Sequence, residues 1–415
     1  MSGLGVFRTT PNGVERIGTL DEQAGKFVYD AQYLASPHAA PISCSLPLRE
    51  QPYTQEDARP YFEGLLPEGA PREAAAAALH VRPEDYLSIL AGYGFECLGD
   101  VIVAHREEEL LGNYEPFDTT GLAELLRRGQ AATINQGSRL SLAGTQGKVG
   151  LYHDSAFPLH EGWSRPLGGA PSTHILKSSS REAVLYLEYL CVHTANLLGV
   201  EAAHTELLDL GGPVLCSERF DRASKGPEVM RLHQEDLAQA FGTTPSSKYA
   251  ELPGGTASAV SSFIRRKCAR PIANIERFAR LSLFNYLIGN CDNHLKNLSV
   301  LYSADWSSLE LAPAYDLVCT TWFPDLSREM GMLLGDEGDI DSVRPTHLAE
   351  FAKQVGLPLR RLRIICSELA RSFCAAVAAT TRAGAPSLDE LAWKAEGLLE
   401  DAEPRRRVLE ETAVL

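Results

Sequence analysis

The chain has 415 residues, of which 44% are hydrophobic and 22% charged, and its 54 acidic residues outnumber its 39 basic ones to give a formal charge of −15. This length predicts two or three domains, and the composition is that of an ordinary globular protein and excludes a disordered one. The negative charge argues against a protein that wraps nucleic acid through its own phosphate contacts, and it suits a basic partner.

The chain shows no targeting signal. Its N-terminus, MSGLGVFRTT, lacks the charged flank, apolar run and small-residue cleavage site of a secretory signal. No segment approaches the roughly 18 apolar residues that would span a bilayer. We therefore expect a cytosolic protein that does not associate with membranes.

The cysteines do not form a recognisable pattern. Nine of them are scattered from Cys44 to Cys374 without a C-x-x-C pair or a Cys/His cluster. Most, such as Cys191 and Cys366, sit in apolar stretches, where free cysteine behaves as a small hydrophobe. We expect reduced core residues, with neither zinc nor disulfides.

The first hundred residues contain short strand-like segments (3–7, 16–20 and 26–29), and helical patterning begins near Thr54. The segment LLGNYEPFDTTG, 110–121, has the Pro, Gly and Thr of a connection between units. We therefore predict an N-terminal α/β subdomain over residues 1–115.

The next hundred residues are rich in strand-like segments. Thr145, Gln146 and Gly147 are expected to form the tip of a hairpin. A helix is expected over 181–198, because its apolar residues fall on one stripe and Gly199 is placed to end it. The strand-like runs are RLSLAG (139–144), KVGLYHD (148–154), THILKS (173–178), HTELLDL (204–210) and GPVLCSERF (212–220).

The remainder of the chain is predicted to be mainly helical. The run IERFARLSLFNYLIGN, 275–290, is apolar on most sides and predicts a buried helix. The octet NCDNHLKN (290–297) then leads into a hairpin formed by NLSVLYS (297–303) and LELAPAYDL (309–317). Together these elements predict an α+β, two-lobed protein-kinase-like fold.

This kinase-like fold is predicted to follow the N-terminal subdomain with a β-rich N-lobe over 122–222 and a helical C-lobe over 223–415.

The octet has the residues that phosphoryl transfer needs. Asp292 and Asn297 have the D-x-x-x-x-N spacing of a protein-kinase catalytic loop, in which the Asp accepts the hydroxyl proton and the Asn holds magnesium. Asp316, after the hairpin, is expected to be the second ligand, since Mg²⁺ prefers oxygen ligands. Taken alone, the octet is better described as a polar turn, since Asp and Asn are ordinary turn residues.

Two upstream residues fit the same chemistry. Lys177 lies in a predicted strand and Glu188 in the helix that follows, the arrangement in which an ion pair aims the lysine at nucleotide phosphates. Alone, Lys177 could be an edge-strand lysine that faces water, and Glu188 could belong to a solvated helix face.

The loop AGTQGK, 143–148, is too short for the Walker A pattern, so it does not support a P-loop NTPase. A glycine-bearing hairpin tip can nevertheless cover phosphates, although glycines are also what hairpin turns require. If the hairpin tip covers phosphates, the ATP contacts come from Ala143, Gly144, Thr145 and Lys148. All these elements occur in the same order as in a protein kinase that uses ATP and Mg²⁺. This shared order is stronger evidence for a kinase than any one motif.

With these motifs in place, the chain resembles the HipA family of bacterial toxin serine/threonine kinases. The matching stretches are SLAGTQGK (141–148), STHILK (172–177), ERFDR (218–222), RLHQEDLAQAFG (231–242), LIGNCDNHLKN (287–297) and LAPAYDL (311–317). The N-terminal block is similar through ISCSLPL (42–48) and FEGLLPEG (62–69), so the resemblance covers nearly the whole chain.

The resemblance implies a role for each matching position. Lys177 would contact ATP phosphates, and Glu218 and the Phe220 backbone would lie along the adenine. Asp292 would be the base, and Asn297 and Asp316 would hold magnesium.

Three further roles come from the same source. Ser141 matches the position at which family members phosphorylate themselves, which ejects the phosphate-covering loop and silences the kinase; a new dianionic group there would repel ATP. Ser141 could also be only a strand serine. Lys296 would contact phosphate, and His294 would have a structural hydrogen-bond role.

The chain departs from the family at two positions. Gly147 stands where the family usually has Glu, so an acidic contact is missing and the loop is expected to be more mobile. Asn293 stands where many relatives have Gly, and either residue tolerates unusual backbone angles.

The resemblance also implies partners: a HipB-like helix-turn-helix antitoxin, operator DNA bound only through that antitoxin, and a protein substrate such as an aminoacyl-tRNA synthetase, whose modification arrests growth. Two other functions remain open. One is a non-catalytic corepressor or scaffold that has kept the fold, and the other is a kinase for a small molecule.

Overall fold

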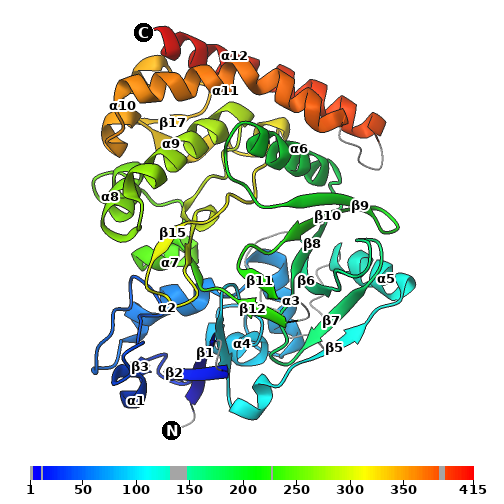
Figure 1. The fold of residues 1–415 in the computed structure, drawn as a ribbon, viewed down its shortest axis with the longest axis vertical. Coiled ribbons are helices and arrows are strands. Elements are labelled where there is room, and N and C mark those ends of the chain that lie inside the picture. Colours follow the sequence, from blue (N-terminus) through cyan, green and yellow to red (C-terminus); the bar gives the residue numbers. More distant parts are fainter. Residues whose placement is uncertain (1–2, 11–12, 131–146, 226–227, 383–387) are drawn as a thin grey trace. The chain divides into compact units, whose positions relative to one another are not determined.

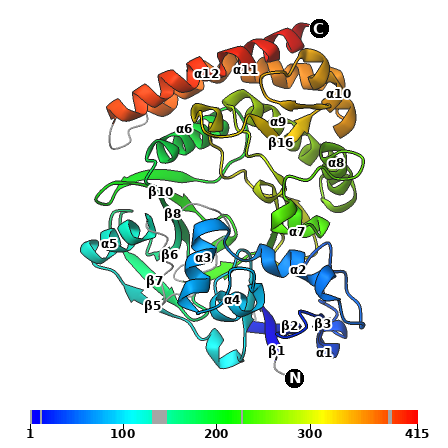
Figure 2. The same cartoon turned by 180° about the vertical axis from the view of Figure 1, so that it is seen from behind.

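The computed structural model describes residues 3–10, 13–130, 147–225, 228–382 and 388–415. The chain folds into two compact units. The first comprises Met1–Ser180, Leu208–Ser247 and Leu301–Ser307, and the second comprises Arg181–Leu207, Lys248–Val300 and Ser308–Leu415. Figures 1 and 2 show the elements from opposite sides. The three-part division expected at 1–115, 122–222 and 223–415 stays a prediction.

The first unit begins with a four-stranded antiparallel sheet in the order β3-β2-β1-β4. Strand β1, one of the two inner strands, is buried from Leu4 to Arg8, and Leu4 and Val6 are inaccessible to solvent. The three strand segments expected here from the sequence are confirmed, and β4 is an addition. The strands are β1 (Gly3–Thr10), β2 (Gly13–Asp21), β3 (Phe27–Tyr29) and β4 (Val101–Ala104).

Most of the other elements of the first unit's N-terminal part are short helices, which lie before and after β4 in the sequence. Helix α2 starts where the sequence predicts, because the Thr54 side chain accepts a hydrogen bond from the Asp57 amide and Asp57 caps the Thr54 amide in return. The helices of the first unit are α1 (Ala31–Leu34), α2 (Gln55–Gly64), α3 (Gly69–Ala78), α4 (Tyr86–Tyr93), η1 (Glu107–Leu110), α5 (Thr119–Gln130), α7 (Leu237–Phe241) and η2 (Pro245–Ser247).

A six-stranded sheet in the order β5-β7-β6-β8-β10-β9 carries the nucleotide-side candidates. Its core packs Leu151, Trp163 and Leu176 against Leu122 and Leu126 of α5, so that helix covers one face of the sheet. The strands are β5 (Asn113–Pro116), β6 (Gly147–His153), β7 (Trp163–Leu167), β8 (His174–Ser178), β9 (Thr205–Asp209) and β10 (Pro213–Glu218).

The sequence prediction for this sheet holds for the strands β6, β8, β9 and β10 and differs at two places. The segment expected to be only a connection contains β5, which pairs with β7 at the sheet edge. Gly147, expected in the hairpin tip, is the first residue of β6 and pairs with Ser178. The other expected strand of that hairpin, 139–144, lies outside the described residues.

Beyond β10 the chain forms short strands before it becomes helical, whereas helices were expected from Arg222 onward. They are β11 (Arg222–Lys225), β12 (Glu228–Arg231) and β13 (Gln234–Asp236).

The second unit is mainly helical, as predicted. Helices α11 and α12 lie side by side, and α6 packs against both (Figures 1 and 2). The helices are α6 (Ala183–Leu197), α8 (Thr256–Lys267), α9 (Pro271–Ile288), η3 (Leu295–Asn297), η4 (Thr320–Trp322), α10 (Pro345–Val355), α11 (Leu359–Arg382) and α12 (Leu388–Val414). Its strands are β14 (Ser299–Tyr302), which ends in the first unit, β15 (Leu309–Leu311), β16 (Glu329–Leu334) and β17 (Glu337–Asp339).

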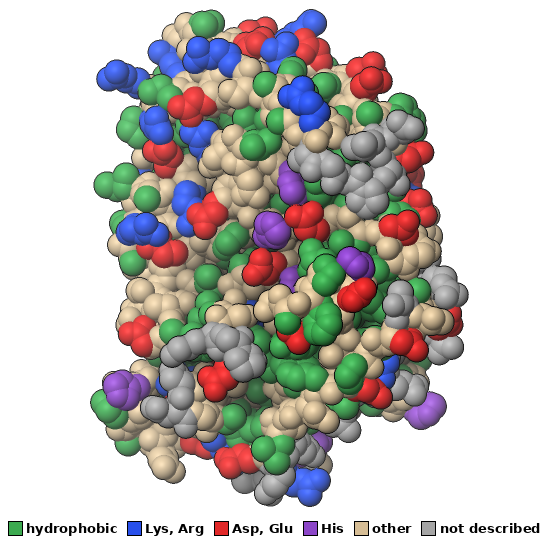
Figure 3. All heavy atoms as spheres, turned by 45° about the vertical axis from the view of Figure 1, so that its right-hand side comes forward, with side chains coloured by type: hydrophobic (Ala, Val, Ile, Leu, Met, Phe, Trp, Pro, Cys, Tyr) green, Lys and Arg blue, Asp and Glu red, His purple; other side chains and the backbone are tan. Residues whose placement is uncertain are grey.

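Three further features of the described residues concern membrane-spanning helices, surface charge and the cysteines. None of the helices in the described part of the chain is long and apolar enough to cross a membrane. On the face drawn in Figure 3, acidic and basic side chains of the described residues are interspersed. Cys191 and Cys366 are buried, as the sequence predicts.

Candidate active site

The octet 290–297 follows a helix that is buried along most of its length. Pro271 opens α9, and Gly289 ends it in the left-handed conformation with φ +75°. A side chain at Gly289 would overlap the hydroxyl of Thr321. Glycine is therefore required twice here, for the backbone angle and for the close approach of another segment.

The octet is held by its own asparagines. The Asp292 amide donates to Asn290 Oδ1 at 3.1 Å, and Asn290 Nδ2 donates to Asn285 Oδ1 at 2.8 Å. Asn297 Nδ2 donates to the Asp292 carbonyl oxygen at 2.8 Å, which commits the amide nitrogen and leaves the amide oxygen as the atom to bind a cation. The structure thus brings Asp292 and Asn297 together as the D-x-x-x-x-N spacing predicts.

The Asp292 carboxylate is accessible to a substrate. Its side chain is 48% exposed, whereas that of His294 is 4% exposed, with Nε2 3.6 Å from Asp292 Oδ1. The phenol of Tyr249 donates a hydrogen bond to the same Oδ1, and its ring meets the His294 ring edge to face at 4.9 Å. A half-exposed carboxylate held between two rings can accept a proton from an incoming hydroxyl.

Asn293 has an ordinary backbone angle. Among the described residues other than glycine, positive φ occurs only at His80, Trp306 and Asp316. The backbone at this position therefore does not require glycine. A Cβ on Gly331 would instead crowd the Asn293 backbone, so β16 passes close to the octet.

Asp316 is in the left-handed region, with φ +52°. The preceding residue fixes it to the octet, because the Tyr315 hydroxyl donates to the Lys296 carbonyl oxygen at 2.7 Å and lies 2.5 Å from Ser299 Oγ. Residues other than glycine adopt this conformation at a cost of about 1–3 kcal/mol and do so preferentially at functional sites. Lys296 itself is buried in η3.

The segment after Asp316 is tied to both the octet and α12. Thr320 Oγ1 accepts from the Cys291 amide at 2.8 Å and donates to the Gly289 carbonyl oxygen at 3.0 Å. Thr321 Oγ1 donates to Asp401 Oδ2 at 2.6 Å.

Arg405, one turn further along α12, pairs with the same Asp401 and donates to the Leu287 carbonyl oxygen at 3.2 Å. The Asp401–Arg405 pair therefore joins the end of α9 to the segment that carries Asp316.

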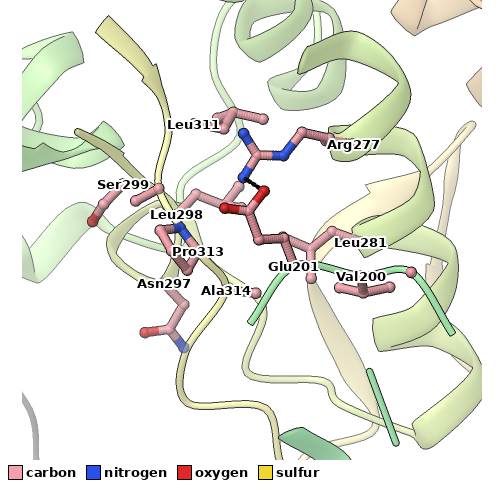
Figure 4. A pocket seen from close by; sticks show the side chains of 12 residues that line it. Val200, Glu201, Arg277, Leu281, Asn297, Leu298, Ser299, Leu311, Pro313 and Ala314 are labelled. Carbon is pink, nitrogen blue, oxygen red and sulfur yellow. Dashed lines mark ion pairs between the residues drawn. The ribbon is translucent and has the colours of Figure 1, made fainter. Parts of the chain in front are cut away.

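A pocket in the second unit has Asn297 in its lining (Figure 4). Apolar side chains including Val200, Leu281 and Leu298 line it. Glu201 and Arg277 form an ion pair at 2.8 Å across it.

In the first unit, Lys177 is buried on an interior strand, which rules out the edge-strand reading. Strand β8 lies between β6 and β10, and Lys177 pairs directly with Lys148. Directly paired residues project from the same face of a sheet, so two ammonium groups share one face, where an anion such as phosphate would be attracted. Glu218 ends β10 and is exposed, and Phe220 follows it.

Glu188 is buried in α6 of the second unit, which rules out the solvated-face reading. The ion pair expected between Glu188 and Lys177 stays a prediction. Ser141, Ala143, Gly144 and Thr145 lie outside the described residues.

A buried charge cluster fixes the backbone around Phe220. Arg219 Nη1 binds Glu96 Oε1 at 2.8 Å and its Nη2 binds Asp221 Oδ2 at 2.7 Å, while Arg222 and Arg231 also contact Glu96. Burial would raise the pKa of Glu96, but the three guanidinium groups outweigh it and lower the pKa to about 2. Removing one charged partner from such a cluster leaves uncompensated charge in the interior.

Sequence reasoning missed Tyr249, Tyr315, Thr321, Asp401 and Arg405. Tyr315 could have been found, because it precedes Asp316 directly. The other four reach the site through contacts that join segments 43 to 118 residues apart, and the local Asp401–Arg405 pair on α12 does not indicate those contacts.

Comparisons with known proteins agree with this geometry. Residues 12–104 match the sequence model of the HipA N-terminal domain, and residues 140–377 match that of the HipA-like C-terminal domain. The Y4mE protein of Sinorhizobium fredii is 34% identical over 355 residues, which cover 81% of this chain and 83% of that protein. The serine/threonine-protein kinase toxin HipA of Shewanella oneidensis is 29% identical over 359 residues, with coverage of 81% and 80%.

The fold is also that of a solved structure, the Shewanella oneidensis HipA, HipB and operator DNA complex, with a TM-score of 0.82 and 24% identity over 99% of each chain. This likeness confirms the predicted α+β, protein-kinase-like fold. On the sequence comparisons, the chain belongs to the HipA family of kinases.

Proposed function

We propose that this protein is an ATP- and Mg²⁺-dependent serine/threonine protein kinase whose general base is Asp292. The octet carries the proposal. The Asp292 carboxylate is half exposed, and the Asn297 side chain donates a hydrogen bond to the Asp292 carbonyl oxygen. Asp316, which follows Tyr315, has a left-handed backbone conformation. These are the parts that phosphoryl transfer to a hydroxyl requires.

In the proposed reaction the oxygen of a serine or threonine side chain attacks the γ-phosphorus of ATP. The bond from that phosphorus to the β,γ-bridging oxygen breaks, and ADP leaves. Asp292 accepts the hydroxyl proton, and His294 holds the carboxylate from one side. The buried position of Lys296 in the same loop suits a phosphate contact.

The oxygen ligands present fit magnesium. The Asn297 amide oxygen and the Asp316 carboxylate supply two hard donors, and phosphate and water would complete the octahedron that Mg²⁺ prefers. When bound, the ion would neutralise charge that develops on the transferred phosphoryl group. Tyr315, next to Asp316, donates to the carbonyl oxygen of Lys296, next to Asn297, and so joins the two ligand-bearing segments.

The nucleotide would bind to the six-stranded sheet. Lys177 and Lys148 share a face on which phosphates would be attracted, and Glu218 with the Phe220 backbone would contact the adenine at the end of β10. Ala143, Gly144 and Thr145 would cover the phosphates, and Glu188 would pair with Lys177. The buried charge cluster supports this assignment, because it fixes the residues on either side of Phe220.

Self-phosphorylation of Ser141 is proposed to silence the enzyme by driving the covering loop away from the nucleotide. Ser141→Ala should abolish the phosphate on this chain while phosphorylation of other proteins continues. Mass spectrometry that locates the phosphate on another residue would refute the assignment of Ser141.

The proposed partner is a HipB-like helix-turn-helix antitoxin, which would link this chain to operator DNA. Support comes from the assembly of the Shewanella oneidensis HipA with HipB and operator DNA. The formal charge of −15 agrees with DNA contact through a partner. The proposed substrate is a translation protein such as an aminoacyl-tRNA synthetase, and its phosphorylation would stop growth.

Labelled ATP and Mg²⁺ test this function directly. The purified protein should transfer phosphate to itself and to a protein of a host-cell extract, and Asp316→Ala should transfer none. Phosphoproteomics after expression in host cells, with the same variant as control, would identify the substrate. Failure to bind ATP would favour a non-catalytic scaffold, and transfer only to metabolites would favour a small-molecule kinase.

A further inference from the structure

The segment between η2 and α8 reaches the catalytic octet through Tyr249. This residue is 56% exposed, yet its hydroxyl donates to Asp292 Oδ1, a contact with no counterpart in the motifs of the sequence. The attacking hydroxyl of a kinase acceptor makes the same interaction, an O–H donated to the carboxylate of the base. The phenol therefore occupies a position that an acceptor hydroxyl needs.

The ring of Tyr249 reinforces this placement. It meets the His294 ring at 4.9 Å with an interplanar angle of 79°, and Lys248 lies 5.3 Å from the ring centroid on its own segment. His294 is buried and lies 3.6 Å from the same carboxylate oxygen. Tyr249 thus covers one oxygen of the base and rests on the residue beside it.

The segment that carries Tyr249 is anchored at one end only a few residues away. The Leu252 amide donates to Thr256 Oγ1 at 3.0 Å, and the Thr256 amide donates to Glu251 Oε1 at 2.5 Å. Gly254 and Gly255 between them adopt positive φ, +81° and +95°. The start of α8 therefore fixes Glu251, and the Tyr249 side chain extends from that anchor toward Asp292.

The contact is weak enough for a substrate to replace. Both side chains are about half exposed, and hydrogen bonds to a charged group contribute less when water can compete for either partner. In this contact the phenol O–H is the donor and the carboxylate oxygen the acceptor, as in the contact that an attacking serine or threonine would make.

We propose that Tyr249 is a specificity-determining residue of the acceptor site: its hydroxyl holds the acceptor position on Asp292 and must be displaced by the serine or threonine of a protein substrate. The inference rests on the proposed role of Asp292. It makes the site selective, because an acceptor hydroxyl displaces the tethered phenol only when the rest of the substrate also contributes binding energy.

Kinetics of Tyr249→Phe test the displacement, because this variant keeps the ring on His294 and removes only the hydroxyl. With dephosphorylated casein as the acceptor probe, we expect KM for casein to fall about three- to tenfold and kcat to stay within about twofold. Hydrolysis of ATP without casein should rise by a similar factor. The control is Tyr152→Phe in β6, for which no change is expected.

Two kinetic results would overturn the proposal. A lower kcat at unchanged KM would mean that Tyr249 orients the base, and unchanged values of both would mean that the acceptor uses the other carboxylate oxygen. The proposed function fails differently: wild type and Asp292→Asn would then transfer phosphate equally, whatever Tyr249→Phe does.

A double-mutant cycle tests the contact without any activity. Melting temperatures of Tyr249→Phe, Asp292→Asn and the double variant should be non-additive, since either change alone removes the hydrogen bond between the two side chains. Strictly additive shifts would contradict the contact and with it the proposal.

Discussion

Asn297 donates from its side-chain nitrogen to the backbone carbonyl oxygen of Asp292 at 2.8 Å, so the proposed metal ligand and the proposed base are fixed to each other within one loop. Asn297→Ala should therefore impair two functions at once. We expect phosphate transfer at a fixed Mg²⁺ concentration to fall at least about tenfold, and part of the loss to be recovered at higher Mg²⁺, as measured by initial rates.

The control for Asn297→Ala is Asn113→Ala in the edge strand β5, where the side chain is exposed. An Asn297→Ala enzyme with wild-type rates and an unchanged Mg²⁺ requirement would contradict the assignment of the ligand.

Lys177→Met should weaken ATP binding. Its ammonium group shares a sheet face with that of Lys148, and removing one of two charges should reduce the attraction for phosphates. The stabilisation of the protein by a non-hydrolysable ATP analogue, measured as a shift in melting temperature, should be lost or greatly reduced. Lys353→Met is the control, because Lys353 pairs with Glu350 on an exposed face of α10; equal shifts in the two variants would exclude Lys177 from the site.

Gly289→Ala should destabilise the protein more than its backbone angle alone explains. Alanine at φ +75° costs roughly 1–2 kcal/mol, and its methyl would also overlap the Thr321 hydroxyl. Gly254 provides a matched control, since it has φ +81° and no atom within 4 Å of an added Cβ. Thermal unfolding should show a larger loss for Gly289→Ala, and equal losses would mean that the close approach of Thr321 does not matter.

Glu96→Gln should be destabilising in a pH-dependent way. The folded pKa of Glu96, about 2, is below its ordinary value of 4.5, so its ion pairs contribute stability above pH 4.5 that is lost as the pH falls toward 2. At neutral pH we expect a loss of roughly 3–5 kcal/mol, the usual scale for breaking a buried pair.

Denaturant unfolding of wild type and Glu96→Gln between pH 7 and pH 2 measures this difference. It should shrink steadily as the pH falls, and a difference that is independent of pH would show that Glu96 does not act through its charge. Glu161→Gln, on an exposed loop, should change stability little at any pH.

The sequence predicted the elements whose signals are local. The strands β6, β8 and β10, the helix α6 and the D-x-x-x-x-N octet were all found from periodicity, turn residues and spacing. Strand β5 was missed because Gly112 before it and Pro116 at its end are typical of a connection, and only pairing with β7 makes it a strand.

The residues of the candidate site also fall into two groups, those with a local signal in the sequence and those without one. Asp292, Asn297 and Asp316 could be named from spacing and order, and Tyr315 from its place before Asp316, whereas the residues that reach the site through long-range contacts could not. Thr321 and Asp401 are 80 residues apart, and Tyr249 and Asp292 are 43 apart, so nothing in either local sequence indicates the contact. Such contacts depend on how the whole unit packs.

The turnover of Asp292→Asn, measured by transfer of labelled phosphate from ATP, tests directly whether Asp292 is the base, and Asp305→Asn in the exposed β14–β15 turn is its control. We predict that Asp292→Asn lowers turnover by roughly two to four decades, the scale for losing acid–base catalysis, while calorimetry shows ATP binding like that of wild type. Undiminished turnover in Asp292→Asn would contradict the assignment of the base and the function built on it.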